Sequence, residues 1–534
     1  MSNLQPNFIL FITDQQRADH LGCYGHPALR TPHIDSIAER GVAMDRFHVA
    51  SPVCMPNRAS LMTGRMPSVH GVRSNGIPLS RSAVTFVDLL AAAGYRTALV
   101  GKSHLQNFTG FAALFKPPEG PPDWRRPPEH LARAIDHRLD GREYAEENPN
   151  GWEGGKRSVG VPFYGFQHVD LVTGHGDQCG ADYLHWLRER HPDADRLRSA
   201  AAALAHDYTC PQAVRTAVPE ELYPSSYIRE RAVACLNDMV ATNKDKPFFL
   251  MVSFPDPHHP FTPPGRYWDM YRPKDMERPA AFARADWRPS PYVERLIAAR
   301  ASGKANVHSQ AAFAVNEREA LEARSLTCGM ISCIDAAIGG VLAALASSGR
   351  REDTVLLFMS DHGDYLGDHR ILLKGPAMYQ GVVRTPFIWS DPYSRARGTR
   401  SGALASTIDV AATILERARL APYLGMQGVS LLGSLENGTA AARESVLIQY
   451  DHQIGPSRPG RMLRTHGLVT GEWRMSIGEG VPGGELYNLK RDPDEFFNLW
   501  DDRATSEDKC ELLHRLARAQ MEAVDELPLP TGRA

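Results

Sequence analysis

The sequence predicts an α/β fold, because buried strand patterns alternate with helical patterns along the chain. Three short apolar runs have the composition of strands buried on both faces, at 7–13, 247–254 and 354–360. Helical patterns lie around and between these runs, at 86–93, 226–242 and 318–345. Helices pack well on both faces of such strands, so we expect one large mixed, mostly parallel sheet sandwiched by helices.

Polar residues follow each predicted strand at the point where the strand ends. Asp14 comes after the first run, His258 and His259 come after the second, and Asp361 and His362 come after the third. The carboxyl ends of parallel strands meet at one edge of a sheet, and ligands bind there. The sequence therefore predicts a polar site at this edge.

The rest of the chain divides into excursions and a C-terminal part. Residues 116–224 and 268–315 are rich in proline and charge, and we expect both to be insertions in a catalytic domain spanning 1–437. From 438 to 534 we expect a small α+β subdomain. Its predicted elements are three short strands and a final helix, at 445–450, 467–470, 473–477 and 506–527.

Bulk properties are those of an ordinary globular protein and exclude some partners. The 534 residues are 43% hydrophobic and 23% charged, and 60 basic against 62 acidic side chains give a net charge of −2. No overall field favours nucleic acid or an anionic membrane, so we expect neither as a partner. The eight cysteines lack paired spacing, and the N-terminus lacks a secretion signal. We therefore expect a cytoplasmic location.

The run Cys54-Met55-Pro56-Asn57-Arg58 resembles the Cys-x-Pro-x-Arg signature of type I sulfatases, the formylglycine-dependent branch of the alkaline phosphatase superfamily. The resemblance extends over most of the chain. Further matching motifs are Gly101-Lys102-Ser103-His104, Pro257-His258-His259-Pro260, Ser360-Asp361-His362-Gly363 and Leu373-Lys374-Gly375. The resemblance implies an alkaline phosphatase-like fold.

The resemblance also implies that a maturation enzyme oxidises Cys54 to formylglycine. The hydrated aldehyde would attack a sulfate ester beside one divalent metal ion, with a covalent sulfo-enzyme intermediate. The implied metal ligands are Asp14, Gln15, Cys54, Asp361 and His362. Family members commonly carry Asp in place of Gln15 and Asn in place of His362. The softer, less anionic set moves the expected ion from calcium towards manganese, with calcium still open.

Three cations are implied to serve the reacting anion. Arg58 would orient the aldehyde hydrate, and Lys102 and Lys374 would hold sulfate oxygens and stabilise charge in the transition state. Two further acids, Asp364 and Asp368, are expected to cap a helix or to orient metal ligands rather than to bind a second metal ion.

The resemblance implies that histidines transfer the protons in the reaction. His104 resembles the base that helps to expel the product anion, and His258 resembles the histidine that protonates the leaving oxygen. The neighbouring His259 is a rival for the second role and a candidate for substrate binding. Asn75 is a further candidate to hydrogen-bond a substrate oxygen.

Three functions compete on this evidence. The first is a sulfuric-ester hydrolase of arylsulfatase type, acting on a small sulfate ester. The second, favoured by Gln15 and His362, is a phosphonate monoester or phosphodiester hydrolase, although such enzymes typically have Tyr and Thr in place of Lys102 and His104. The third is a non-catalytic anion- or metal-binding protein that keeps its cysteine unmodified. Relatives in the phosphonate branch often assemble, so we expect a homodimer or homotetramer.

Overall fold

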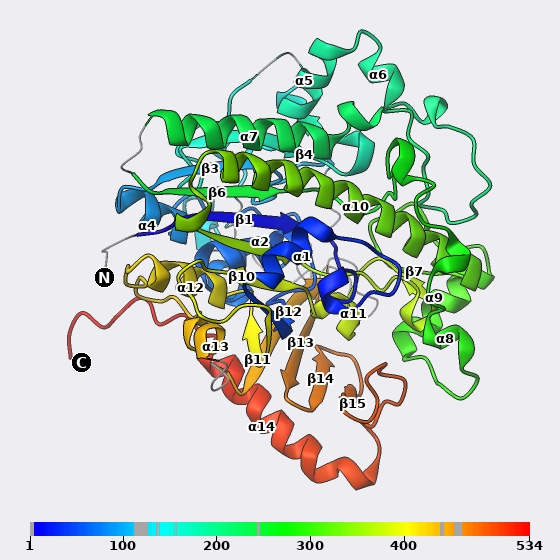
Figure 1. The fold of residues 1–534 in the computed structure, drawn as a ribbon. Coiled ribbons are helices and arrows are strands. Elements are labelled where there is room, and N and C mark those ends of the chain that lie inside the picture. Colours follow the sequence, from blue (N-terminus) through cyan, green and yellow to red (C-terminus); the bar gives the residue numbers. More distant parts are fainter. Residues whose placement is uncertain are drawn as a thin grey trace.

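The structure is built on one twisted sheet of nine strands (Figure 1). It is a computed structural model that describes residues 5–111, 127–134, 137, 139–153, 155, 157–242, 246–437, 443–452 and 462–533. The strand order is β11-β2-β10-β8-β1-β6-β3-β4-β5. In chain order the strands are β1 (Asn7–Thr13), β2 (Val42–His48), β3 (Arg96–Gly101), β4 (His168–Thr173), β5 (Gly180–Ala181), β6 (Phe248–Ser253), β8 (Thr354–Ser360), β10 (Phe387–Ser390) and β11 (Thr399–Ser406).

Most neighbouring strands of this sheet run parallel. β1 pairs in parallel with β6 and β8, β3 pairs in parallel with β6 and β4, and β11 pairs in parallel with β2. β10 runs antiparallel to both of its neighbours, and the two-residue β5 runs antiparallel to β4. The predicted mixed, mostly parallel sheet is confirmed, and so are its three predicted central strands.

Helices cover both faces of the sheet, because successive side chains of a buried strand point to opposite sides. Phe8 and Leu10 of β1 pack with helices α2 (Cys54–Thr63), α4 (Phe86–Ala92) and α12 (Asp409–Arg417). Ile9 and Phe11 pack with helices on the other face. These are α1 (Pro32–Glu39), α5 (Asp182–Arg190), α7 (Pro224–Thr242) and α10 (Glu317–Ser347).

The long helix α10 lies alongside α7 on this second face (Figure 1). By length and composition α10 would suit a membrane span, but 67% of its most apolar window is buried inside the protein. A capping box at Asn316 and Glu319 begins the helix. Its apolar character therefore has an explanation in packing against the sheet.

The segment 116–224 is not the simple excursion that the sequence suggests. Part of it lies outside the described residues, but β4, β5 and α5 belong to it and extend the main sheet beyond β3. The runs that form β4 and β5 are short and carry polar residues, which hides their strand character in the sequence. This part of the segment is core structure.

The second segment, 268–315, packs against the chain that leads to Lys374. It contains α8 (Ala280–Ala283), α9 (Pro291–Ala301) and β7 (Phe313–Ala314), and β7 pairs with β9 (Ile371–Leu372). Trp287 and Val293 of this segment are buried with Tyr365 and Tyr379. The segment thus packs against the chain on either side of Lys374, one of the predicted catalytic lysines.

The C-terminal part forms a small antiparallel sheet, in agreement with the predicted fold class. Its strands are β12 (Ser445–His452), β13 (Leu463–Thr470), β14 (Trp473–Gly478) and β15 (Glu485–Asn488). Helix α14 (Ser506–Glu522) lies along this sheet (Figure 1). The helix stops at Glu522, five residues short of the predicted end, and the predicted domain boundary at 437/438 borders residues outside the described part.

Candidate active site

Polar side chains from two strand ends meet the start of helix α2 at one edge of the sheet. Asp14 follows β1, Asp361 and His362 follow β8, and Cys54 is the first residue of α2. The Cys54 sulfur lies 3.1 Å from His362 Nε2 and 3.6 Å from Asp14 Oδ1. The ligand atoms of these four residues all lie within 4.8 Å of one another. Four of the five predicted metal ligands are thus neighbours in space.

Helix α2 holds Cys54 rigidly, because all ten of its residues are buried. Pro56 lies in the first turn, where its missing N–H costs no helical hydrogen bond. Gly64 ends the helix with φ of 65°, a left-handed conformation that favours glycine. Asn57 ties the helix to the sheet edge, since its amide donates to the Asp361 carbonyl and its oxygen accepts from Ala50 N at 2.9 Å.

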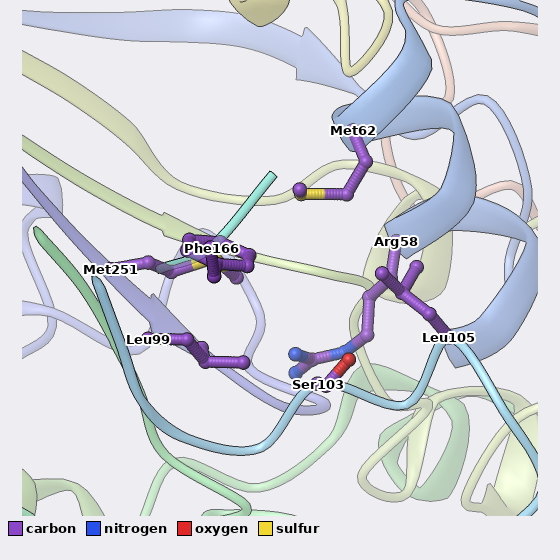
Figure 2. Close-up of a pocket in the computed structure, with 7 residues that line it drawn as sticks. All are labelled: Arg58, Met62, Leu99, Ser103, Leu105, Phe166 and Met251. Carbon is purple, nitrogen blue, oxygen red and sulfur yellow. The ribbon is translucent and has the colours of Figure 1, made fainter. Parts of the chain in front are cut away.

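Arg58 reaches from α2 into the site, where two of its three guanidinium nitrogens donate hydrogen bonds and Nη2 has no hydrogen-bond partner among the described residues. Its Nε donates to Asp361 Oδ2 at 2.7 Å, and its Nη1 donates to Ser253 Oγ at 3.0 Å. Its Nη2 lies 3.5 Å from Asp14 Oδ2. Figure 2 shows the guanidinium beside Ser103 at a cavity of about 10 Å³, room for one water molecule at most. The cavity cannot hold a sulfate ester. Arg58 lies between the Asp14 and Asp361 carboxylates, and its predicted role in orienting the aldehyde hydrate stays a prediction.

Lys102 follows β3 and points at Asp14. Its ammonium forms an ion pair with Asp14 Oδ2 and lies 2.8 Å from His175 Nε2. The preceding Gly101 has φ of 110°, and a β-carbon there would collide with the Ser253 carbonyl. Only glycine lets β3 approach β6 this closely at the point where the chain turns Lys102 into the site.

Lys374 enters from the opposite side, on the turn that follows β9. Its Nζ lies 2.8 Å from both Gln15 Oε1 and His258 Nε2, 3.1 Å from His362 Nε2 and 3.3 Å from the Cys54 sulfur. An ammonium has three protons to donate, so Lys374 is shared among the cysteine, the proposed metal ligands and the proposed proton donor. Residues 364–373 are fixed by the Asp364 carboxylate, which accepts from Leu373 N at 2.8 Å.

Gln15 differs from the other predicted metal ligands in its surroundings. Its amide donates to Asp364 Oδ2 at 2.5 Å and lies 3.1 Å from His259 Nδ1, while its oxygen accepts from Lys374. Asp364 therefore orients Gln15, which is one of the two roles predicted for that acid. His259 faces Gln15, whereas His258 faces Lys374, so the two neighbouring histidines occupy different places.

Three stacked histidines line this side of the site. The rings of His175 and His258 are stacked with centroids 3.5 Å apart, and those of His258 and His259 are 4.0 Å apart. His175 comes from the segment after β4, and no role for it follows from the sequence patterns. The signal that would have found it is its position two residues beyond a strand end, which requires β4 to be recognised first.

His104 stacks on Phe108, with ring centroids 3.7 Å apart. Among the described residues no hydrogen bond joins its ring to Cys54, and its Nδ1 is buried without a partner. The backbone around it is held by a second residue absent from the sequence prediction, Glu147. The carboxylate of Glu147 accepts from the N–H groups of His104, Leu105 and Gln106 at 2.8 to 3.0 Å.

Asn75 lies at the start of α2, where its side-chain oxygen accepts from Met55 N at 3.0 Å. This contact supports the turn that carries Cys54. Its predicted contact with a substrate oxygen stays a prediction.

Burial and charge together set the ionisation of the site. Burial alone would raise the pKa of Asp14, but Lys102, Lys374 and Arg58 hold it well below its usual range. Burial raises the pKa of the Cys54 thiol to about 11. Burial, His175 and Lys374 lower the pKa of His258 well below its usual range. The site therefore contains an ionised Asp14, a protonated Cys54 thiol and a neutral His258.

This donor set fits a divalent metal ion. Asp14 and Asp361 offer hard carboxylate oxygens, His362 offers an imidazole nitrogen, and the residue at position 54 completes the group. The Nδ1 of His362 contacts its neighbour Gly363 O at 2.9 Å, which fixes Nε2 as the nitrogen that faces Cys54 and Asp14.

Comparison with known proteins agrees with this arrangement. The family model "Sulfatase" matches residues 6–420, and a model for the C-terminal region of N-sulphoglucosamine sulphohydrolase matches residues 367–522. An arylsulfatase of Clostridium perfringens is 26% identical over 535 residues, which cover 98% of this chain and 96% of the relative.

Solved structures share the fold. The phosphonate monoester hydrolase of Agrobacterium radiobacter superposes with a TM-score of 0.74 at 24% identity, covering 98% of this chain and 96% of the other. A protein solved with its substrate D-glucosamine-2-N,6-O-disulfate gives a TM-score of 0.68 at 20% identity, covering 99% and 100%. The family model covers most of the chain, including every strand of the main sheet. The protein has an alkaline phosphatase-like fold and belongs to the sulfatase family, the hydrolases of sulfate esters.

Proposed function

We propose that this protein hydrolyses small sulfate monoesters of aryl type through a formylglycine made from Cys54, with one divalent metal ion bound by its neighbours. The observation that carries the proposal is the position of Cys54. Its sulfur lies within 3.6 Å of Asp14, His362 and the Lys374 ammonium at the buried start of α2. A nucleophile held among an anion-binding cation and metal-binding side chains suits attack on an ester of a strong acid.

The metal ion would be held by Asp14, Asp361, His362 and the modified residue 54, with Gln15 beside them. When bound, the ion supplies positive charge at the reacting anion, and the hydrated aldehyde supplies the nucleophilic oxygen. We propose manganese or calcium as the ion. The imidazole of His362 and the amide of Gln15 favour manganese over calcium.

The chain's own residues bind the anion and move protons. Lys102 and Lys374 donate to sulfate oxygens, and the low dielectric of the buried site strengthens these contacts. His258 gives a proton to the leaving oxygen. Burial, His175 and Lys374 keep the pKa of His258 low. A bound anion would oppose the charge of Lys374 and raise this pKa, which favours the protonated imidazole. His104 takes the proton when the product anion leaves.

Two further expectations accompany this function. The formylglycine requires a maturation enzyme as a partner, and the resemblance to the phosphonate branch favours a homodimer or homotetramer. We also propose a cytoplasmic location.

The first test is the chemistry of residue 54. Protein made together with a formylglycine-generating enzyme should carry an aldehyde in the tryptic peptide 47–58, measured by mass spectrometry. It should turn over p-nitrophenyl sulfate, and Cys54→Ala should lower kcat/KM by at least about 1,000-fold. Cys510→Ser, which changes an exposed thiol on α14, is the matched control and should keep full activity. A modified protein without turnover of any sulfate ester would contradict the proposal.

The second test concerns the metal ion. Dialysis against a chelator should abolish turnover, and addition of manganese or calcium in separate samples should restore it. The ion that restores the higher kcat/KM identifies the preferred metal. Full activity of protein shown to be metal-free would contradict the proposed role of the Asp14, Asp361 and His362 set.

A second candidate function is hydrolysis of phosphonate monoesters or phosphodiesters with the same nucleophile. Gln15 and His362 favour it, because they make the metal site less anionic than in sulfatases that carry a further Asp and an Asn. Matched p-nitrophenyl sulfate and p-nitrophenyl phenylphosphonate separate the two. A higher kcat/KM for the sulfate supports the first proposal, and a higher value for the phosphonate replaces it with the second.

A further inference from the structure

A cluster of soft metal-binding side chains lies outside the proposed active site, between the segment after β1 and helix α10. His20, His26 and Cys328 bring their ligand atoms within 4.8 Å of one another. The Cys328 sulfur also lies 3.9 Å from the Met276 sulfur. His20, Met276 and Cys328 are buried, and His26 is half-buried. None of these residues takes part in the proposed hydrolysis.

His20 is oriented as a metal ligand would be. Its Nδ1 lies 2.8 Å from Asp19 Oδ1, and the carboxylate holds the imidazole proton on that nitrogen. The lone pair of the ring is therefore on Nε2, which is buried and has no hydrogen-bond partner within the described part of the chain. A carboxylate behind an imidazole is the arrangement that orients metal-binding histidines. Core packing explains Cys328 and Met276, but it leaves His20 Nε2 unsatisfied.

His26 has a different role in the cluster. Its Nδ1 accepts hydrogen bonds from Ala28 N at 3.2 Å and Leu29 N at 2.9 Å, so its proton is on Nε2. That Nε2 lies 3.9 Å from the Cys328 sulfur. His26 is thus a hydrogen-bond donor towards the sulfur, and the available ligand atoms are one nitrogen and two sulfurs.

We propose that His20 Nε2, Cys328 Sγ and Met276 Sδ form a three-coordinate site for a soft monovalent metal ion, Cu(I). Two metal–sulfur bonds of about 2.3 Å in a trigonal site place their sulfurs about 4 Å apart. The observed separation of the Cys328 and Met276 sulfurs is 3.9 Å. Thiolate, thioether and imidazole are the ligands that select Cu(I).

Charge balance favours a monovalent ion in this buried place. Binding breaks the S–H bond of Cys328, forms a sulfur–copper bond and releases the proton to water. One thiolate and one Cu(I) give a neutral unit, whereas a divalent ion would leave a buried positive charge.

The test is an anaerobic Cu(I) titration against a chromophoric Cu(I) chelator. The background is the full chain with Cys54→Ala and Cys510→Ser, which removes the active-site sulfur and the exposed thiol. We expect one ion per chain, with two sulfurs and one nitrogen around it by X-ray absorption. Cys328→Ser and Met276→Leu should each weaken binding at least about tenfold.

The control is Cys333→Ser, which alters another buried thiol of α10 outside the cluster and should leave copper affinity unchanged. Met276→Leu nearly conserves the side-chain volume and should keep the fold. Its copper affinity therefore tests the proposal even if Cys328→Ser fails to fold. Circular dichroism checks the fold of each variant. Failure of the background protein to bind one ion, or equal affinity in Met276→Leu and the background, would overturn the proposal. Sulfate-ester turnover plays no part in this test.

Discussion

At the scale of single residues, the site depends on side chains that position other side chains. His175 is the clearest example, since it contacts the Lys102 ammonium at 2.8 Å and stacks on His258. Without the His175 ring, the side chains of Lys102 and His258 can both move. A shift of about 1 Å in a catalytic group is enough to slow a reaction strongly.

His175→Ala should therefore lower kcat/KM for p-nitrophenyl sulfate by about 10- to 100-fold, without loss of the fold. His168→Ala is the matched control, because His168 is exposed at the opposite end of β4. Steady-state kinetics of the two variants check this expectation. Equal kinetics for both variants would show that His175 has no part in the reaction.

Glu147 gives a prediction about pH. Burial raises its pKa to about 7, and three backbone N–H groups oppose the shift. Because the folded-state pKa lies above the unfolded value, Glu147 favours the folded state below about pH 4.5, and this contribution is lost as the pH rises through 7.

The free energy of unfolding should thus fall by up to about 3 kcal/mol between pH 4.5 and 8 through this one group. Glu147→Gln removes that pH-dependent part. It also turns an amide NH₂ towards backbone donors, which lowers stability by about 1–3 kcal/mol at every pH. Urea unfolding at pH 5 and pH 8 measures both effects. An unchanged pH dependence in the variant would assign the titration to another residue.

At the scale of elements, strand ends and helix ends carry the chemistry. β1, β3, β6 and β8 deliver Asp14, Lys102, His258 and Asp361 to one edge, and the start of α2 delivers Cys54. The close approach of β3 to β6 depends on Gly101, which combines a φ of 110° with contact against the Ser253 carbonyl.

Gly101→Ala should lower the free energy of unfolding by about 3 kcal/mol or more, because strain and collision add. Gly94→Ala is the matched control, since Gly94 has φ of 94° and open space where a β-carbon would be. It should cost about 1 kcal/mol from strain alone. Denaturant unfolding of both variants checks the difference. Equal losses would mean that the strands can move apart freely.

At the scale of the whole molecule, the C-terminal part contacts the catalytic part through Glu495, which a buried ion pair within the C-terminal part holds in place. Arg474 of β14 is fully buried and pairs with Glu485 and Glu495 at 2.7 and 2.6 Å. Glu495 also accepts from Gln380 N at 2.6 Å, and its carbonyl contacts His369 Nε2 at 3.0 Å. His369 lies in the turn that leads to Lys374. The C-terminal part therefore supports the segment that carries this lysine into the candidate active site.

Arg474→Ala should destabilise the protein by about 3–5 kcal/mol, because two acids are left without their buried partner. Arg515→Ala removes an exposed pair with Glu511 on α14 and should cost at most about 1 kcal/mol. Thermal unfolding with activity measured in parallel checks both. A loss below about 1 kcal/mol in Arg474→Ala would mean that these buried ion pairs contribute little to stability.

The sequence by itself determined the class of sheet, its central strands and the nature of the site. Short continuous apolar runs are typical of strands buried on both faces, and the polar residues that follow parallel strands gather at one edge of the sheet. Cys54, Arg58, Lys102 and Lys374 could be named because the local motifs that contain them resemble those of sulfatases. The bounds of β1 followed from its apolar run, and those of α10 followed to within two residues from its alternating polar and apolar faces.

Only the tertiary structure decided which distant segments complete that edge. β4 is short and carries polar residues, so the sequence hid both the strand and His175 beyond it. Glu147 and Asp364 act by accepting backbone or amide hydrogen bonds across the fold, and such contacts leave no periodic pattern. The cluster of His20, Met276 and Cys328 joins segments about 50 and 300 residues apart, because packing of α10 on the sheet, rather than spacing in the chain, brings them together.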